Sequence, residues 1–381
     1  MKMKEVYFDN AATTKVDLKV TEKMLPYFGE RYANASSVHP FGFLSKEATN
    51  EAREIISDKL NCKPEEIVFT SGGTESNNLA MKGLFFKNKD KNHIITTKIE
   101  HDCILETCKW LERNGAKVTY LDVDSEGFID LDQLKDAITD ETLVVSVIHA
   151  NNEIGTIQDI EAIGKICKER GVLFHTDACQ SFTKLDIYVE KMNLDLVTIN
   201  SHKIHGPKGV GALYIKEGTE VETIMHGGGH EKSLRSGTHN VSGIVGFGEA
   251  VKIADEEDIK KMEELRDKLI DGLLKIPRTT LNGPVTRLCN NANISFNDIE
   301  GEAVGGFLEN SKIYTSTGSA CMSNTLKSSH VLEALGQDPL RRNSSLRISI
   351  SKFTTEEEVE YFLKEIKRIV EKLREMSPLV E

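Results

Sequence analysis

The chain has 381 residues, of which 39% are hydrophobic and 28% are charged, an ordinary composition for a soluble globular protein. A chain of this length is too long to fold around one small core and fits one large domain plus a smaller one. The formal net charge of −12 argues against a nucleic-acid-binding protein, because such a protein needs a basic surface. The charge still allows a protein partner that carries a basic face.

The sequence predicts neither a secretory signal nor a membrane segment. Met1–Lys4 is followed by the strand-like run Val6–Phe8 and not by an apolar run with a cleavage site. No stretch approaches the ~18 consecutive apolar residues of a membrane helix. The seven cysteines are scattered without a CxxC pair. This favours reduced thiols, and so a cytoplasmic location, over a disulfide framework or a zinc site.

Short runs of β-branched or apolar residues predict seven strands. They are Ile67–Thr70, Ile94–Thr97, Lys117–Leu121, Leu143–Ile148, Val172–Thr176, Leu196–Ile199 and Ala212–Ile215. Between several of these strands, apolar residues recur at helical spacing. One example is Ile160, Ile163 and Ile166, which predict a helix whose end Gly171 suits. Alternating strands and helices predict an α/β fold with a largely parallel sheet covered on both faces. Ligands of such sheets bind beyond the carboxyl ends of the strands.

The pattern changes after residue 250. The predicted elements there are a long charged helix at Asp255–Leu274, a strand at Ala292–Phe296, a helix near Glu302–Asn310 and a strand at Leu346–Ile350. The last helix begins with a capping box from Thr355 to Glu358 and carries an apolar stripe that we expect to be core. We place a domain boundary near residue 255. Residues 15–255 form the large domain, and residues 1–14 fold back onto a small domain of residues 256–381.

A lysine and a carboxylate follow two of the predicted strands. Lys203 can form a Schiff base with an aldehyde cofactor, although a surface lysine in a turn would also fit. Asp177 ends the strand before it, with Gln180 three residues on. Pyridoxal phosphate (PLP) needs an acid beside its pyridine nitrogen, whereas the alternative for Asp177 is a helix cap. The pair at successive strand ends favours a PLP site.

Two further features have the chemistry that such a site needs. Thr70–Asn78 opens a predicted helix with small residues, whose free N–H groups can bind phosphate. The pair of glycines in this run is not GxGxxG, which disfavours a dinucleotide; a helix start capped by Ser71 or Thr74 is the alternative. The imidazole of His101 can stack on a cofactor ring and exchange protons with a substrate, while a single histidine is more often structural.

Together these motifs resemble the cysteine desulfurases of the iron–sulfur-cluster assembly type, in the class-V aminotransferase family of fold-type-I PLP enzymes. The resemblance runs nearly end to end. The segments that carry it, in family order, are Tyr7–Thr14, Ser71–Asn77, Glu100-His101, Asn151–Gly155, Asp177–Gln180, His202-Lys203, Gly206–Gly209, His226–Glu231, Arg235–Thr238, Gly318–Cys321 and Ser345–Arg347. The resemblance implies a homodimer whose large domain has a mainly parallel seven-stranded sheet, with a smaller α/β C-terminal domain.

The resemblance also implies which residues hold cofactor and substrate. Lys203 would carry PLP, Asp177 would pair with its pyridine nitrogen, and His101 would stack on its ring. Further cofactor contacts would come from Asn152 and Gln180 at the ring oxygen, from Gly73, Thr74, Asn200, Ser201 and His202 around the phosphate, and from Thr238 of the second subunit. Arg347, with Asn10 nearby, would clamp the carboxylate of L-cysteine, since a guanidinium fork matches a carboxylate. A cross-strand ion pair is the alternative for Arg347.

The sequence departs from the family pattern at two places. Asn200 stands where the family usually has a serine that contacts phosphate, and Ser201 stands where it has Gly or Ala. Because the Asn amide can donate, we expect phosphate binding to survive with altered affinity. Ala35 replaces a common proline, which affects loop stiffness more than chemistry.

Cys321 determines the specific activity that the resemblance implies. It lies in Thr317–Thr325, a run of small and polar residues typical of an exposed, mobile loop. After the freed Lys203 has removed the Cα proton, the Cys321 thiolate would attack the sulfur of L-cysteine, leaving alanine and a persulfide on Cys321. The persulfide would pass to a scaffold protein or another acceptor, for iron–sulfur cluster assembly or tRNA thiolation.

Isolated cysteines are usually small buried residues, so we expect this of the other six, with Cys179 near the cofactor. No metal site is expected beyond a transient iron–sulfur ligand at Cys321. A related PLP lyase, such as a selenocysteine lyase or the second desulfurase group, is one alternative; that group places its cysteine after Gly-His-His, unlike Gly318–Cys321. A cofactor-free scaffold is another, which the intact Lys203, Asp177 and His101 argue against.

Overall fold

The computed structural model describes residues 5–317 and 329–377, and its largest sheet has seven strands. In sheet order they are β2 (Ile67–Thr70), β8 (Gly211–Ile215), β7 (Leu196–Asn200), β6 (Leu173–Asp177), β5 (Thr142–Ser146), β3 (His93–Thr97) and β4 (Lys117–Leu121). Neighbouring strands are parallel except where β8 meets β2 and β7. The mainly parallel seven-stranded sheet predicted from the sequence is confirmed.

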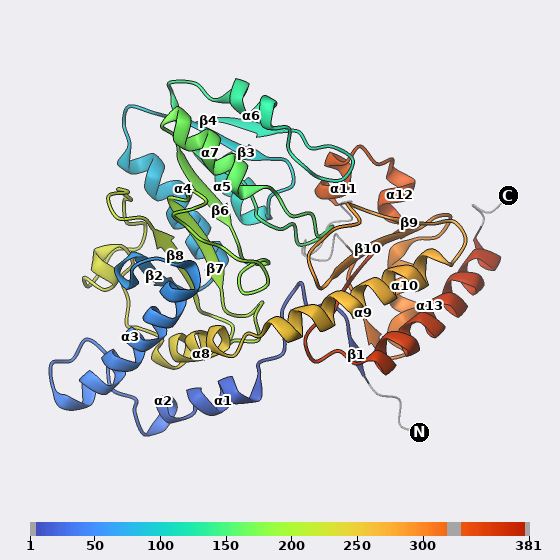
Figure 1. Cartoon of the computed structure of the whole chain (residues 1–381), viewed down its shortest axis with the longest axis horizontal. Coiled ribbons are helices and arrows are strands. Elements are labelled where there is room, and N and C mark those ends of the chain that lie inside the picture. The colour runs from blue at the N-terminus through green and yellow to red at the C-terminus, as the bar shows by residue number, and fades with distance from the viewer. Residues whose placement is uncertain (1–4, 318–328, 378–381) are drawn as a thin grey trace.

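Helices cover both faces of this sheet (Figure 1). One face packs against α3 (Pro40–Leu60), α6 (Leu131–Ala137), α7 (Ile160–Arg170) and α8 (Val241–Lys252), the other against α4 (Gly73–Lys87) and α5 (Asp102–Glu112). Side chains alternate between the two cores, as Ile67 and Phe69 join the first and Val68 the second. This double burial explains why the strands are continuous apolar runs.

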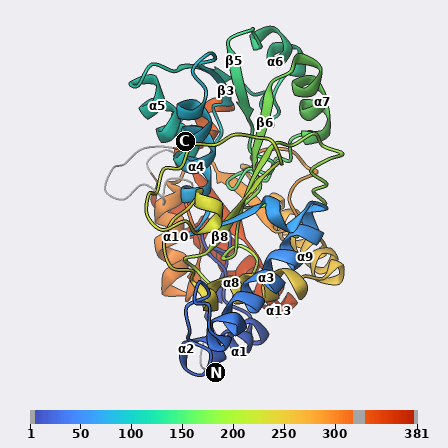
Figure 2. The same ribbon diagram turned by 90° about the vertical axis from the view of Figure 1, so that its left-hand side faces the viewer.

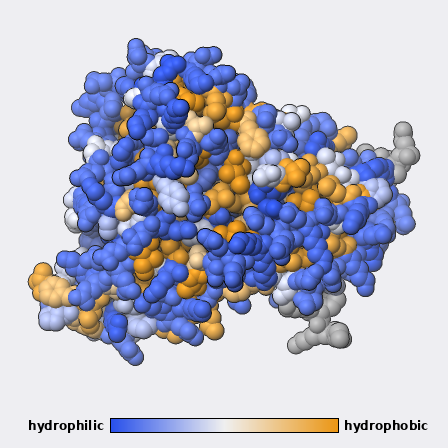
Figure 3. All heavy atoms as spheres, in the orientation of Figure 1, coloured by the Kyte–Doolittle hydropathy of each residue, from blue (hydrophilic) through white to orange (hydrophobic). Residues whose placement is uncertain are grey.

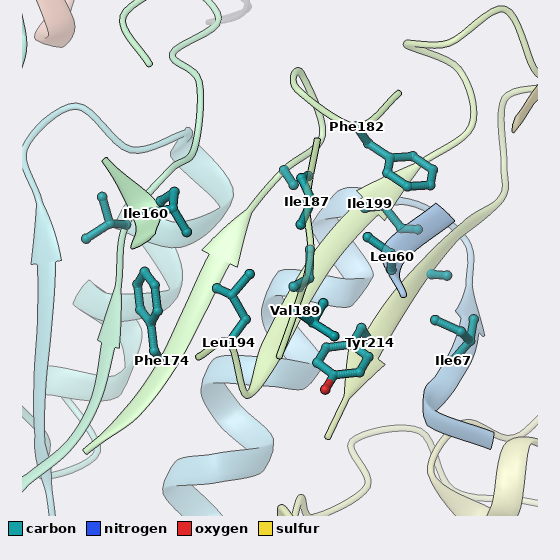
Figure 4. Packing of buried hydrophobic residues seen from close by; sticks show 14 of the residues in the cluster. Leu60, Ile67, Ile160, Phe174, Phe182, Ile187, Val189, Leu194, Ile199 and Tyr214 are labelled. Carbon is teal, nitrogen blue, oxygen red and sulfur yellow. The ribbon is translucent and has the colours of Figure 1, made fainter. Parts of the chain in front are cut away.

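The first of these cores fixes the strands that carry the site. Figure 4 shows Phe174, Ile199 and Tyr214 from β6, β7 and β8 packed among Ile160 of α7 and Leu60 of α3. All five are at most 2% exposed. Burying one such side chain stabilises the folded protein by about 1.5–3 kcal/mol. The ends of β6 and β7 are therefore held on a rigid support.

A second unit lies beside the large sheet (Figures 1 and 2). It has an antiparallel sheet in the order β12 (Ser345–Ser349), β10 (Asn291–Phe296), β9 (Thr279–Leu281), and the helices α9 (Glu256–Leu274), α10 (Gly301–Asn310) and α13 (Glu356–Met376). Near the N-terminus, β1 (Val6–Tyr7) pairs in parallel with β11 (Ile313–Tyr314). Val6 and Phe8 belong to this unit's own hydrophobic core. The division into two domains stays a prediction, which the separate cores support.

The remaining elements are short. They are α1 (Leu18–Met24), α2 (Pro26–Gly29), α11 (His330–Ala334), α12 (Pro339–Asn343) and the 3-10 turns Pro64–Glu66 and Glu231–Ser233. The capping box from Thr355 to Glu358 is confirmed at α13. The strand predicted to reach Ile148 ends at Ser146. Beyond it, the N–H groups of Val147 and His149 still donate to β6, whereas the Ile148 N–H donates to the Glu100 carboxylate at 2.8 Å.

Hydrophilic residues cover most of the face drawn in Figure 3, and several groups of apolar atoms lie over its middle. A further apolar group lies at the end formed by α2 and the start of α3. Exposed apolar side chains there include Phe28, Val38 and Phe43. Among the described residues, no helix is both long and apolar enough to cross a membrane.

Candidate functional site

A cavity of about 280 Å³ opens beyond the carboxyl ends of the central strands. It is lined by Ala11, Ala12, Gly73, Thr74, His101, Cys103, Ile148, Asn152, Asp177, Cys179, Gln180, Asn200, His202, Lys203 and Arg347. β6 and β7 are parallel neighbours that end at Asp177 and Asn200, which brings Asp177 close to the segment carrying Lys203. The strand order thus gathers residues that lie far apart in the sequence, at the edge where ligands of such sheets bind.

Of the predicted site residues that the structure describes, three do not line this cavity. Ser201 is fully buried, and its hydroxyl has no hydrogen-bond partner among the described residues. Thr238 is exposed on the surface of its own chain. Asn10 donates its side-chain amide to the carbonyl oxygens of Tyr7 and Ser349, at 3.1 and 2.8 Å. The other predicted cofactor residues and Arg347 lie together in the cavity wall.

The Asp177 carboxylate is 4% exposed and is held by two N–H donors. One oxygen accepts from Asn77 Nδ2 at 2.7 Å, and the other accepts from the Cys179 backbone N–H at 2.9 Å. The second contact lies within a turn, and no helix begins after Asp177, so the alternative of a helix cap is wrong. Asp177 lies in the cavity wall, and the two donors hold its carboxylate in one orientation.

Lys203 ties the N-terminal segment to the site. Its ammonium group donates to the carbonyl oxygens of Ala11 and Ala12, the latter at 2.8 Å. Gln180 also donates to the Ala11 carbonyl, at 3.0 Å. Sequence analysis did not single out the two alanines, whose role is carried by the backbone. The only signal was their place in the Tyr7–Thr14 motif.

The start of α4 leaves backbone donors free. No side chain caps this helix at Gly72, so the alternative of a start capped by Ser71 or Thr74 is wrong. The first N–H groups of a helix carry a partial positive charge that attracts phosphate. A second hollow, of about 420 Å³, adjoins the cavity at Gly73, and Lys208 lines it.

The residues around Gly73 fit a phosphate-bearing group. A Cβ on Gly73 would come within 2.7 Å of Cys179 Sγ, so only glycine allows this close approach of helix and sheet. Asn200 is 4% exposed, and its side-chain oxygen has no partner among the described residues. Open helix donors and a nearby ammonium group at a lysine-containing cavity are compatible with PLP. The Asn200 amide nitrogen, 3.5 Å from the position of a Cβ on Gly73, can donate to its phosphate.

His101 caps α5 and contacts a cysteine that sequence analysis did not place here. Its Nδ1 accepts from the Cys103 backbone N–H at 3.2 Å and lies 3.0 Å from Cys103 Sγ. Burial, followed by the charge of Asp177, raises the pKa of the Cys103 thiol to about 12 and that of Cys179 well above its ordinary value. Both thiols are therefore neutral near pH 7. Cys179 lies beside the cavity as expected.

The Cys321 segment lies outside the described residues, but the chain that follows it is anchored at the cavity. Ser329 Oγ lies 2.5 Å from the carboxylate of Glu153, which is 5% exposed. Burial raises the pKa of Glu153. The next residue, His330, bonds to the Glu100 carbonyl at 3.0 Å through Nε2. These contacts hold the start of α11 against the segments that carry His101 and Asn152.

Arg347 is 1% exposed, and its guanidinium group donates to Asp9 at 2.9 Å. The ion-pair alternative is thus realised, with a partner from the N-terminal segment. The Nε of Arg347 has no partner among the described residues, although the side chain lines the cavity. A guanidinium with one unpaired donor can bind a carboxylate. Across the same residues, no cluster of three His, Cys, Asp or Glu could hold a metal ion.

Comparisons with known proteins place these features in context. Residues 6–362 match the family model of the class-V aminotransferases. The chain is 50% identical over 381 residues to the cysteine desulfurase IscS of Methanosarcina thermophila, covering 99% of this chain and 94% of that protein. It is 50% identical over 386 residues to the cysteine desulfurase IscS of Clostridium botulinum, covering 99% and 97%.

Solved structures are similar as well. A NifS-like protein of 42% identity has a TM-score of 0.92, with 97% of this chain and 100% of that chain covered. The structure described as SspA in complex with cysteine, 41% identical, has a TM-score of 0.83, with 92% and 100% covered. The family match over residues 6–362 includes all segments that line the cavity.

Proposed function

The chain belongs to the class-V aminotransferase family, and from this premise we propose that it is a cysteine desulfurase, which takes sulfur from L-cysteine and leaves L-alanine. The supporting observation is that one cavity gathers Lys203, Asp177, His101 and Arg347. Full-length relatives bear the name cysteine desulfurase, and a similar structure holds cysteine.

PLP is the cofactor that this cavity would hold. Lys203 would bind its aldehyde carbon and Asp177 its pyridine nitrogen, with His101 against the ring and Asn152 and Gln180 at the ring oxygen. The phosphate would meet the start of α4 at Gly73 and Thr74, together with Asn200 and His202. When bound, PLP supplies an electron sink that makes the Cα proton of an amino acid removable.

Side chains of the protein would bind the substrate, remove its proton and accept its sulfur. Arg347, whose side chain lines the cavity, would bind the substrate carboxylate while Asp9 holds the guanidinium in place. Lys203 would take the Cα proton at Nζ. The Cys321 thiolate would attack the substrate sulfur, so that a sulfur–sulfur bond forms as the carbon–sulfur bond breaks. Alanine leaves after reprotonation, and the persulfide stays on Cys321.

We also propose a homodimer and a protein acceptor for the persulfide sulfur. Thr238, which the resemblance assigns to the phosphate, is exposed and lies outside its own chain's cavity, as a residue serving the second subunit would. The acceptor would be an iron–sulfur scaffold or a protein of tRNA thiolation. The cytoplasmic location stays a prediction.

Product analysis tests the proposal. Purified protein is loaded with PLP and given L-cysteine and a thiol reductant, with Lys203→Ala in parallel. Alanine and sulfide in equal amounts from the unmodified protein, and neither from the variant, are expected. Pyruvate and ammonia would instead identify a β-elimination lyase. An absence of alanine in spite of bound PLP would overturn the proposal.

A further inference from the structure

A chain of hydrogen bonds links Asp177 to His101 through two residues to which the proposed chemistry gives no part. Asn77 Nδ2 lies 2.7 Å from Asp177 Oδ2 and 3.0 Å from Cys103 Sγ. Cys103 Sγ in turn lies 3.0 Å from His101 Nδ1. Asn77 is fully buried, and Cys103 lines the cavity between it and the imidazole.

The direction of each bond follows from the donors available. The Asn77 amide has two hydrogens, one for the Asp177 carboxylate and one for the Cys103 sulfur. The sulfur therefore accepts from Asn77, and its own hydrogen is left for His101 Nδ1. That nitrogen also accepts from the Cys103 backbone N–H at 3.2 Å, as the cap of α5. A ring nitrogen that accepts carries no proton, so the proton of the neutral imidazole is on Nε2.

We propose that Cys103 is a positioning residue for His101: its thiol shares the Nδ1 lone pair with the backbone N–H of the cap, strengthens the preference for the Nε2 tautomer and for this ring orientation, and couples both to Asp177 through Asn77. The inference rests on the proposed function, because His101 is taken to lie against the cofactor ring that Asp177 binds. Burial keeps the thiol protonated, with a pKa of about 12, so it remains a donor at neutral pH. Without it, the backbone cap alone orients the ring.

The test compares Cys103→Ala and Cys103→Ser in PLP-loaded protein labelled with ¹⁵N-histidine. The unmodified protein should show His101 with a protonated Nε2 and an unprotonated Nδ1, assigned by loss of the signals in His101→Gln. In Cys103→Ala only the backbone N–H still donates to Nδ1, so the preference for one tautomer should weaken and the two nitrogen shifts should move toward each other. Turnover should fall about tenfold with KM nearly unchanged, because a misplaced acid–base group loses part of the rate acceleration that it contributes when positioned. A serine can accept from Asn77 and donate to Nδ1, so Cys103→Ser should restore both readouts.

Cys108→Ala provides the matched control, since this buried thiol lies on the same helix but outside the cavity. Wild-type shifts and turnover in Cys103→Ala would overturn the proposal, as would the same changes in Cys108→Ala. If the unmodified protein makes no alanine from cysteine, the proposed function fails. The nitrogen shifts would still decide the role of Cys103.

Discussion

An alanine at position 73 has no room between α4 and the sheet. Its Cβ would lie 2.7 Å from Cys179 Sγ and 3.5 Å from Asn200 Nδ2. The helix start and Cys179 must part by roughly 0.7 Å to regain an ordinary contact of 3.4 Å. Overpacking of this kind costs about 1–3 kcal/mol. If the strain destabilises the PLP-bound protein and not the cofactor-free protein, Gly73→Ala should weaken PLP binding by about 5- to 150-fold.

The assay is a titration of cofactor-free protein with PLP, followed by visible absorption, with urea unfolding of the same samples. Cys179→Ala added to Gly73→Ala removes the clashing sulfur and should restore most of the affinity. Gly306→Ala is the control: nothing lies within 4 Å of its Cβ, so PLP affinity should not change. Wild-type PLP affinity and wild-type unfolding of Gly73→Ala would refute the close contact on which this reasoning depends.

Three further predictions concern Arg347, Glu100 and Thr183. Arg347→Lys keeps the charge but loses the fork, so KM for L-cysteine should rise about tenfold or more with a smaller change in kcat; initial rates at varied cysteine check this. Burial raises the pKa of Glu100 from the ordinary 4.5 to about 8, so between these values the folded protein keeps a proton that the unfolded chain has lost. The free energy of unfolding should therefore fall as the pH rises from 4.5 to 8, and Glu100→Gln, followed by urea unfolding across this range, should flatten the fall. An equal slope in both proteins would contradict that assignment. Thr183 has a φ of 65°, unfavourable for a β-branched residue, so Thr183→Gly should raise the free energy of unfolding by about 1 kcal/mol in urea; a decrease would argue against strain at this turn.

The sequence predicts the site well where strand ends determine which residues meet. Asp177 and Lys203 were predicted to face one cavity because each follows a recognisable buried strand. The strand pattern alone does not give the order of strands, and here β6 and β7 are direct neighbours. That adjacency, together with the predicted strand ends, accounts for the central pair of the site.

Other parts of the site leave no side-chain pattern in the sequence. Ala11 and Ala12 take part through carbonyl oxygens, which any residue possesses. An isolated cysteine resembles a buried apolar residue, and the role of Cys103 depends on the turn by which His101 caps α5. Asn10 belongs to a site motif, yet its amide faces the backbone of Tyr7 and Ser349, a direction that no spacing predicts.

The most direct test of the central claim follows the sulfur itself. PLP-loaded protein and its Cys321→Ala variant are each given one equivalent of L-cysteine without reductant, then analysed for alanine and by intact-protein mass spectrometry. The account predicts one alanine per site and the mass of one added sulfur on the unmodified protein, located on Cys321, and neither in the variant. Alanine formed equally by Cys321→Ala, or an added sulfur on another cysteine, would contradict it.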